Sequence, residues 1–251
     1  MLDGQVPLTV VIPALNEVDQ IAECIGQVAW ADEVIVADGG SADGTVERAR
    51  AAGAVVLEGT GSTIAGQRNT AIAHARNTWV FALDADERVT EELRVEIAAV
   101  LRAPVHTAYW VRRQNFYLGR ELTRGHWGRD WVVRLFTKDL RYIERRVHEA
   151  VEPVARSGRL RASLRHVPYR DLTHQLDKMN RYARWGAEDM YEQGRRATLW
   201  DLWARPLGRF LRAYLLHGGC WDGRFGLVSS VLGGYTAFLK YAHLWALERE
   251  R

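Results

Sequence analysis

The chain has 251 residues, a length that suits one α/β domain with a C-terminal extension better than two independent cores. With 47% hydrophobic and 26% charged residues, it is not a disordered or collagen-like chain. The formal net charge of +3 conceals an uneven distribution, because residues 1–100 hold 6 Lys or Arg against 16 Asp or Glu and the remainder holds 28 against 15. The acidic part suits a cation, and the basic part suits an anionic partner.

Other general features favour the cytoplasm. The N-terminus has no cationic segment followed by an apolar one, as a secretory signal would have. The two cysteines, Cys24 and Cys220, lie far apart and outside any metal-binding spacing, so we expect both to be free. No helix-turn-helix, zinc-finger or RNA-binding motif is present, and nucleic acid is not expected as a partner.

Four short segments predict a parallel sheet. They are rich in β-branched residues and nearly all apolar, as buried parallel strands are; they cover residues 8–12, 33–37, 54–57 and 79–83. Segments with helical spacing separate them, which is the alternation of a Rossmann-like α/β fold. Ligands of such sheets bind at the carboxyl ends of the strands, where the loops 13–17, 38–45 and 84–87 are expected.

The pattern changes after Thr90, which is expected to cap a helix. The segments 108–118, 131–138 and 140–143 have the alternation of antiparallel strands. From about Asp171 the chain becomes helical and aromatic. The sequence therefore predicts a mostly parallel α/β sheet with an antiparallel extension and a helical C-terminal region, divided into a catalytic domain of residues 1–170 and an extension of residues 171–251.

An acidic cluster, Asp84-Ala85-Asp86-Glu87, follows the apolar segment 79–83. Two carboxylates two positions apart can hold a divalent cation, which can neutralise a leaving diphosphate. A solvated turn with a helix cap uses the same residue types, and such short matches are common by chance. The position directly after a buried strand favours the metal site.

Three further motifs surround this cluster in the sequence. They are Val11-Ile12-Pro13-Ala14-Leu15-Asn16-Glu17, Asp38-Gly39-Gly40-Ser41-Ala42-Asp43-Gly44-Thr45 and Ala65-Gly66-Gln67-Arg68-Asn69. Together with the acidic cluster they resemble, in order, the motifs of family 2 glycosyltransferases of GT-A fold. Four ordered matches across about 75 residues are more specific than any one of them.

The second half resembles one branch of that family, the lipopolysaccharide-core β-1,4-glucosyltransferases. The resemblance rests on Phe116-Tyr117-Leu118-Gly119-Arg120, Arg134-Leu135-Phe136, Val147-His148-Glu149 and the Gly-rich, aromatic region from Trp221 onward. Where that branch commonly has aspartate and serine after its second strand, this chain has Asp38-Gly39-Gly40-Ser41. This departure leaves the choice of nucleotide base open.

The resemblance implies a nucleotide-sugar site. Its residues would be Pro13, Ala14, Asn16, Glu17, Asp38, Gln67, Arg68, Asp84, Ala85 and Arg134. Asp38 would accept a hydrogen bond from the base imide, and arginines, with Arg112 and Arg113 as further candidates, would engage the diphosphate. Asn16 and Glu17 also fit a helix N-cap and a first-turn acid that bind no ligand.

The same resemblance implies a metal and a general base. Asp86 and His148 would bind Mg²⁺ or Mn²⁺. Family 2 enzymes invert configuration in a single displacement, so one carboxylate must reach the acceptor hydroxyl; Glu149 is the first candidate and Asp130 the second. The alternative for residues 147–149 is a plain strand edge, with His148 a satisfied polar residue.

The C-terminal region predicts an amphipathic helix. On a helical wheel, Arg205, Arg209 and Arg212 form a stripe opposite a second stripe of Trp203, Leu207, Phe210 and Tyr214. Pro206 is expected to start or kink this helix. Peripheral contact with an anionic membrane and packing as a helix pair both explain the pattern. The longest uncharged segment, 225–239, has 15 residues, whereas a membrane-spanning helix needs about 20.

The sequence as a whole predicts an inverting, metal-dependent glycosyltransferase. We expect it to move a hexose from a UDP-sugar to a saccharide or lipid-linked saccharide in cell-envelope glycan synthesis, at the inner face of the cell membrane. A sugar-nucleotide nucleotidyltransferase is one alternative, although it usually has a Gly-rich loop with Lys or Arg after the first strand, where this chain has Pro13-Ala14-Leu15-Asn16-Glu17. A non-catalytic nucleotide-sugar or membrane-binding module is the other.

Overall fold

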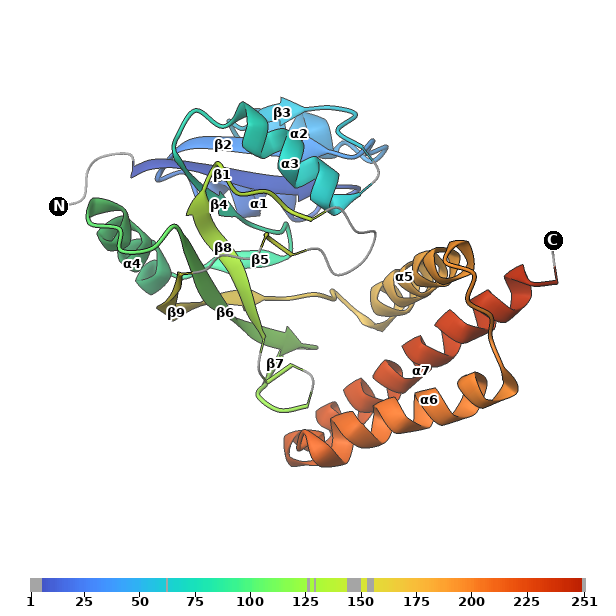
Figure 1. Ribbon diagram of the computed structural model, residues 1–251. Helices are drawn as coiled ribbons and strands as arrows, with labels where there is room; N and C mark the ends of the chain where they lie inside the picture. Colours follow the sequence, from blue (N-terminus) through green and yellow to red (C-terminus); the bar gives the residue numbers. More distant parts are fainter. Residues whose placement is uncertain are drawn as a thin grey trace. The chain divides into compact units, whose positions relative to one another are not determined.

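The computed structural model describes residues 6–61, 63–125, 127–128, 130–143, 150–152 and 156–249. The chain forms two compact units (Figure 1). The first, here called the sheet unit, comprises Met1–Arg113 and Trp131–His166; the second, the helical unit, comprises Gln114–Asp130 and Val167–Arg251. The predicted division into a catalytic domain and an extension at residue 170 stays a proposal, because the existence of two compact units does not show which of them is catalytic.

The sheet has the order β3-β2-β1-β4-β8-β6-β9-β5, with β7 paired to β6. Its parallel strands are β1 (Val6–Ala14), β2 (Ala31–Asp38), β3 (Val55–Leu57) and β4 (Trp79–Ala82). The other strands are β5 (Glu87–Val89), β6 (Ala108–Tyr117), β7 (Arg120–Leu122), β8 (Trp131–Thr137) and β9 (Ser157–His166). Strand β8 runs antiparallel to β4 and β6. The parallel sheet with an antiparallel extension is therefore confirmed.

Helices cover both faces of the sheet because its central strands are apolar on both sides. These helices are α1 (Ile21–Gly26), α2 (Thr45–Ala51), α3 (Ile64–His74) and α4 (Glu91–Arg102). On β1, Val10 and Ile12 belong to the core that contains α1, α2 and α4 residues, whereas Val11 belongs to the core that contains α3 residues. The alternation along one buried strand thus separates the two helical layers.

Several predicted details differ from the structure. The cap of α4 is confirmed, since Thr90 Oγ1 accepts a hydrogen bond from the Leu93 N–H at 3.2 Å. Residues 140–143 were expected as a strand, but only Tyr142 forms a bridge, to Val151. Strands β5 and β9 pair with each other and had no prediction.

The helical unit contains α5 (Leu172–Glu192), α6 (Leu199–Leu211) and α7 (Gly223–Leu247), with a π-helical turn, η1 (Arg212–Leu216), and a 3₁₀ turn, η2 (Gly219–Asp222). Pro206 lies inside α6, which begins at Leu199 after a capping box formed by Thr198 and Asp201. Of the two expectations for Pro206, a helix start is therefore wrong, and a kink stays a prediction. Among the described residues, none forms a helix long and apolar enough to cross a membrane.

The segment Gln114–Asp130 is bound to the helices of its own unit. Tyr117 Oη donates a hydrogen bond to Gln175 Oε1 at 2.8 Å, and Trp127 Nε1 donates one to Ser229 Oγ at 2.7 Å. The backbone N–H of Arg124 donates to Asp222 at 3.0 Å. The helical unit is thus built from two separate parts of the sequence.

Candidate functional site

Two loops are joined at the carboxyl ends of β1 and β2, because Ala14 and Asp38 end these strands in register. The Asn16 N–H donates to Ser41 Oγ at 2.8 Å, and the Ala42 N–H donates to Asn16 Oδ1 at 3.0 Å. Asn16 has a φ of 58°, in the left-handed region that asparagine tolerates better than most residues. These exchanged hydrogen bonds fix the two loops against each other.

The alternative interpretation of Asn16 and Glu17 as a helix cap and first-turn acid is not observed. Helix α1 begins at Ile21 and its N-cap residue is Gln20. Glu17 instead donates its backbone N–H to Thr45 Oγ1 at 2.8 Å. Both residues therefore serve the loop that borders the end of the sheet.

Asp38 is the most unusual polar residue of this region, since it is only 2% exposed. Its Oδ2 accepts hydrogen bonds from the N–H groups of Gly40 at 2.8 Å and Ser41 at 3.0 Å. Its Oδ1 is buried and has no hydrogen-bond partner within the described part of the chain. A buried acceptor without a partner is energetically costly, and this oxygen has the capacity to accept a further hydrogen bond.

A cavity of about 400 Å³ lies beside this carboxylate. It is lined by Asp38, Gly40, Ser41, Ala42, Gly44, Val46, Glu47, Glu58 and Gly59. Its volume falls within the range of small-molecule sites. Asp38 therefore offers its buried acceptor beside a space that can hold a nucleoside-sized group.

Glycine is required next to Asp38. A Cβ atom at Gly39 would overlap the side-chain amide of Gln67, which donates to the Gly61 carbonyl at 3.1 Å. Gln67 is itself 3% exposed, so it cannot move into solvent without breaking this packing.

Charged side chains form a buried network at the end of β4. Asp84 accepts hydrogen bonds from Arg68 through Oδ1 and from Arg134 through Oδ2. Arg134 also donates to Glu87 Oε1 at 2.6 Å, and Arg113 approaches that oxygen at 3.5 Å. Arg68, Arg134 and Glu87 are at most 3% exposed.

The network keeps Asp84 ionised. Burial alone would raise the pKa of the Asp84 carboxyl, but the charges of Arg134 and then Arg68 hold this pKa well below its ordinary value. Asp84, Arg68 and Arg134 therefore lie together, as the shared assignment to the nucleotide-sugar site expected. In this structure the two guanidinium groups are engaged by carboxylates.

Asp86 lies beside a histidine that the motifs did not identify. His166 Nε2 is 3.5 Å from Asp86 Oδ1, and both side chains are largely buried. The pairing of β5 with β9 places His166 opposite Glu87, the residue next to Asp86. Only the long-range strand pairing could have identified it. Within the described ranges, no group of three or more His, Cys, Asp or Glu residues is arranged to hold a metal.

The remaining predicted residues are distributed as follows. Pro13, Ala14 and Ala85 are buried at the strand ends, where the Ala14 carbonyl accepts from the Gly39 N–H at 2.9 Å. Asp130 belongs to the helical unit and accepts a hydrogen bond from Asn115 Nδ2 at 3.1 Å. His148 and Glu149 lie outside the described residues.

The chain on either side of residues 144–149 is well anchored. Ile143 donates its N–H to the Ala150 carbonyl at 2.8 Å, next to the bridge between Tyr142 and Val151. Asn69 holds this pair by exchanging two hydrogen bonds with the Tyr142 backbone, at 2.8 and 2.9 Å. The Gln67-Arg68-Asn69 motif therefore connects to Gly61 through Gln67, to Asp84 through Arg68 and to Tyr142 through Asn69.

Known proteins resemble this chain over most of its length. The profile of the family described as Glycosyl transferase family 2 matches residues 9–167. The lipopolysaccharide core biosynthesis glycosyltransferase LpsC of Rhizobium meliloti is 29% identical over 250 residues, which cover 96% of this chain and 93% of LpsC. The glycosyltransferase RP128 of Rickettsia prowazekii is 28% identical over 243 residues, 91% of this chain and 83% of that protein.

Likeness to solved structures is more limited. One example is glucosyl-3-phosphoglycerate synthase from Mycobacterium tuberculosis in complex with Mn²⁺, UDP and phosphoglyceric acid. It is 25% identical, with a TM-score of 0.37, over 46% of this chain and 44% of that structure. The match therefore spans less than half of either chain.

Proposed function

Because the chain belongs to glycosyl transferase family 2, we propose that it transfers a hexose from a UDP-sugar to an acceptor hydroxyl with inversion of configuration. Family membership makes it a glycosyltransferase, and the similarity to LpsC over 96% of the chain supports a role in envelope glycan synthesis. The acceptor proposed here is a saccharide or a lipid-linked saccharide.

The buried Oδ1 of Asp38 is the observation that carries the choice of uridine. Uracil presents an imide N–H, which is a donor, at the position where cytosine presents an acceptor nitrogen. A carboxylate is acceptor-only, so it would favour uracil over cytosine. Asp38 Oδ1 has no partner within the described chain, and Asp38 is one of the residues that line the 400 Å³ cavity, which supports this role.

The diphosphate of the donor would lie toward the acidic cluster. Asp86, with His148, would hold Mg²⁺ or Mn²⁺, and the imidazole of His166 at 3.5 Å adds a nitrogen beside the Asp86 carboxylate. Of these donors, the Asp86 carboxylate is the one that suits Mg²⁺ or Mn²⁺ best, and the cation would take most of its other ligands from phosphate and water oxygens. When bound, the cation supplies positive charge to the leaving diphosphate.

The residues around the cluster are proposed to position it. Arg68 and Arg134 bind both oxygens of Asp84 and therefore fix the turn that leads to Asp86. Glu87 accepts the Asp84 N–H at 3.0 Å and closes the same turn. Backbone at Pro13, Ala14 and Ala85 would line the donor, and Asn16, Glu17 and Gln67 would keep the surrounding loops in place.

The proposed transfer is a single displacement. The acceptor oxygen forms a bond to the anomeric carbon from the face opposite the diphosphate, whose own bond to that carbon breaks. A carboxylate takes the acceptor proton, and Glu149 is the proposed base, with Asp130 second. UDP leaves with the bonding electron pair.

The experiment combines donor turnover with two matched variants. Purified protein is incubated with UDP-hexoses and Mn²⁺, and UDP release is followed with and without saccharide acceptors. We expect Glu149→Gln to lower kcat by about 10²- to 10⁴-fold with little change in donor affinity, because the amide cannot take the proton. Asp130→Asn should retain most of the activity.

Three outcomes would contradict parts of this proposal. Release of hexose 1-phosphate rather than UDP would indicate attack at phosphorus, and therefore nucleotidyl transfer. A large loss in Asp130→Asn and a small one in Glu149→Gln would exchange their roles. Donor binding unaffected by Asp86→Asn and by metal removal would exclude the metal site.

A further inference from the structure

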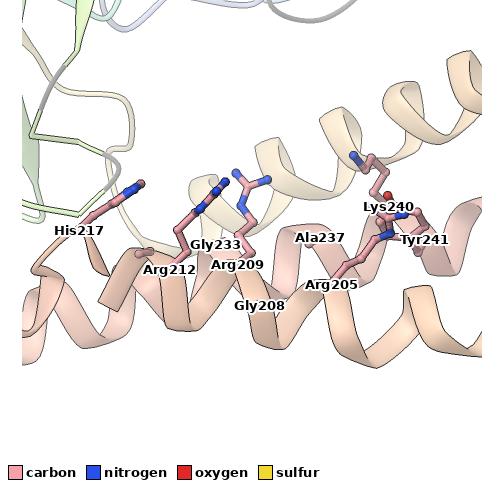
Figure 2. A pocket seen from close by; sticks show the side chains of 10 residues that line it. Arg205, Gly208, Arg209, Arg212, His217, Gly233, Ala237, Lys240 and Tyr241 are labelled. Carbon is pink, nitrogen blue, oxygen red and sulfur yellow. The ribbon is translucent and has the colours of Figure 1, made fainter. Parts of the chain in front are cut away.

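A second cavity lies within the helical unit, and none of the residues that line it is assigned to the donor. It has a volume of about 510 Å³ and lies between α6, η1 and α7 (Figure 2). Arg205, Arg209, Arg212 and Lys240 line it. Figure 2 shows Arg209 and Arg212 projecting from the same side of α6 and η1.

The positive charge of this cavity is only partly neutralised. Arg205 forms an ion pair with Asp201 and lies over the Tyr241 ring at 5.1 Å. Within the described chain, no acidic side chain lies within salt-bridge distance of Arg209, Arg212 or Lys240. Three cationic side chains therefore line one cavity, and none of them has an acidic partner among the described residues.

The surrounding positive charge is a secondary cause of a shift in the pKa of Lys240. Burial is the largest cause, followed by the charges of Arg209, Arg195 and Arg205, and together they lower the pKa of the Lys240 ammonium. Repulsion of this kind destabilises the folded chain unless an anion relieves it. The same region is not a packed core, because a Cβ atom at Gly208 would meet no atom within 4 Å.

We propose that this cavity is a binding site for a phosphate ester, whose phosphoryl or diphosphoryl group is held by Arg209, Arg212 and Lys240. Guanidinium groups bind phosphate oxygens bidentately, and a diphosphate matches three cations better than a single carboxylate does. A cavity of about 510 Å³ exceeds the needs of inorganic phosphate, so it has room for the group that carries the ester. The site is independent of the proposed sugar transfer.

Lysine acetylation can report on this site alone. The chain has three lysines, Lys138, Lys178 and Lys240, so limiting acetic anhydride followed by mass spectrometry resolves each one. The full chain is treated in metal-free buffer with increasing inorganic pyrophosphate. We expect saturable protection of Lys240, by about fivefold or more, with Lys138 unchanged. No divalent metal is present, so failure of the donor site would not affect the result.

Substitutions distinguish a specific binding site from non-specific attraction by positive charge. In the double variant Arg209→Ala with Arg212→Ala, the pyrophosphate concentration that gives half-maximal protection of Lys240 should rise by at least about 10-fold, because charge-assisted hydrogen bonds are lost. Arg224→Ala with Arg249→Ala removes the same charge from exposed positions outside the cavity and should change it by less than about twofold. Gly208→Leu keeps every charge, fills the cavity and should also weaken protection.

Two further arms identify the source of the phosphate. Vesicles containing phosphatidic acid carry a phosphomonoester, whereas phosphatidylserine vesicles of equal surface charge do not. Protection by pyrophosphate assigns a soluble phosphate ester, and protection by phosphatidic acid alone assigns a lipid headgroup. Absence of protection in all arms, equal protection by both lipids alone, or protection unchanged in the Arg209 and Arg212 variant would overturn the proposal.

Discussion

Asp38 is expected to select the nucleotide base. Asp38→Asn keeps an oxygen for the Gly40 and Ser41 N–H groups and replaces the free acceptor by an amide donor. We therefore expect UDP affinity to fall by about 10- to 100-fold and the preference for UDP over CDP to shrink, because the amide can donate to cytosine. Calorimetric titration of both nucleotides measures this.

Asp32→Asn is the control for this change, because Asp32 lies on the same strand and accepts from Asn77 at 3.0 Å near its opposite end. It should leave both affinities unchanged. Equal UDP and CDP binding by the unchanged protein would count against the uridine proposal.

Asp84 is expected to act on stability as well as on donor binding. Asp84→Asn leaves Arg68 and Arg134 buried with one less counter-charge, which should lower the free energy of unfolding by about 3 kcal/mol near pH 7. The exposed pair of Glu91 and Arg94 provides the control, since Glu91→Gln should have no measurable effect. Denaturant unfolding measures both.

The pH dependence follows from the lowered pKa of Asp84. Because the folded-state pKa lies below the unfolded value of about 3.9, the stabilisation is present above about pH 4 and is lost as the pH falls toward the folded-state pKa. The stability difference between the natural protein and Asp84→Asn should thus be constant from about pH 6 to 8 and shrink in acid. A difference that grows on acidification would contradict this ion pairing.

For individual residues, the sequence predicted which ones lie at the strand ends, but not which side chains contact one another there. Asp38, Asp84 and Arg68 were identified from motifs, and strand register brings their loops to one end of the sheet. His166 follows Asp84 by about 80 residues, and no local pattern distinguishes it from a surface histidine. Its place beside Asp86 depends on the β5–β9 pairing, which is a tertiary property.

Among the elements, the parallel strands were predictable from short, nearly continuous apolar segments, and the helices between them from the helical spacing of their apolar residues. Strand β5 has only three residues, Glu87–Val89, and begins at the last residue of the acidic motif, so neither length nor periodicity indicated it. Proline favours a helix start, but Pro206 lies inside α6. The capping box of Thr198 and Asp201 begins this helix about two turns earlier.

Close packing of α6 on α7 depends on Gly234. A Cβ atom there would lie 2.9 Å from the Pro206 carbonyl oxygen and 3.4 Å from Phe210 Cβ, so the helices would have to separate. We expect Gly234→Ala to destabilise the protein by about 1–3 kcal/mol, the usual cost of overpacking. Thermal unfolding of the full chain measures this.

Gly208→Ala is the matched control, because it makes the same change in α6 where the added methyl group meets nothing within 4 Å. It should be neutral or stabilising by up to about 1 kcal/mol, since alanine favours a helix over glycine. Equal effects of the two substitutions would show that helix propensity, and not the contact with Pro206, decides stability.

For the molecule as a whole, peripheral membrane contact remains a proposal that the exposed side chains of the helical unit support. Trp200 is 63% exposed and Trp203 53% exposed on α6, and α7 exposes Val231, Tyr235 and Phe238. Aromatic and aliphatic residues at a surface that also carries arginines are typical of interfacial helices. The same side chains would also be exposed in a single chain if the helix pair packs on another copy of the protein.

Vesicle sedimentation distinguishes these explanations. We expect binding to anionic vesicles that weakens as salt is raised, because surface charges are screened over about 10 Å at 0.1 M salt. Trp200→Ser with Trp203→Ser should reduce binding at every salt concentration, since it removes apolar area. Binding indifferent to lipid charge, or concentration-dependent dimerisation without lipid binding, would favour packing.

Because the helical unit is built from two separate parts of the sequence, the chain cannot be cut into independent fragments, or exchanged by recombination, at an arbitrary point. Asp222 on the C-terminal side binds the Arg124 backbone, and Ser229 binds Trp127, so both need the segment Gln114–Asp130. A fragment of residues 171–251 would leave these polar groups without their partners. We therefore expect the helices not to behave as an interchangeable module at the end of a gene: recombination within the family should exchange the inserted segment and the C-terminal helices together.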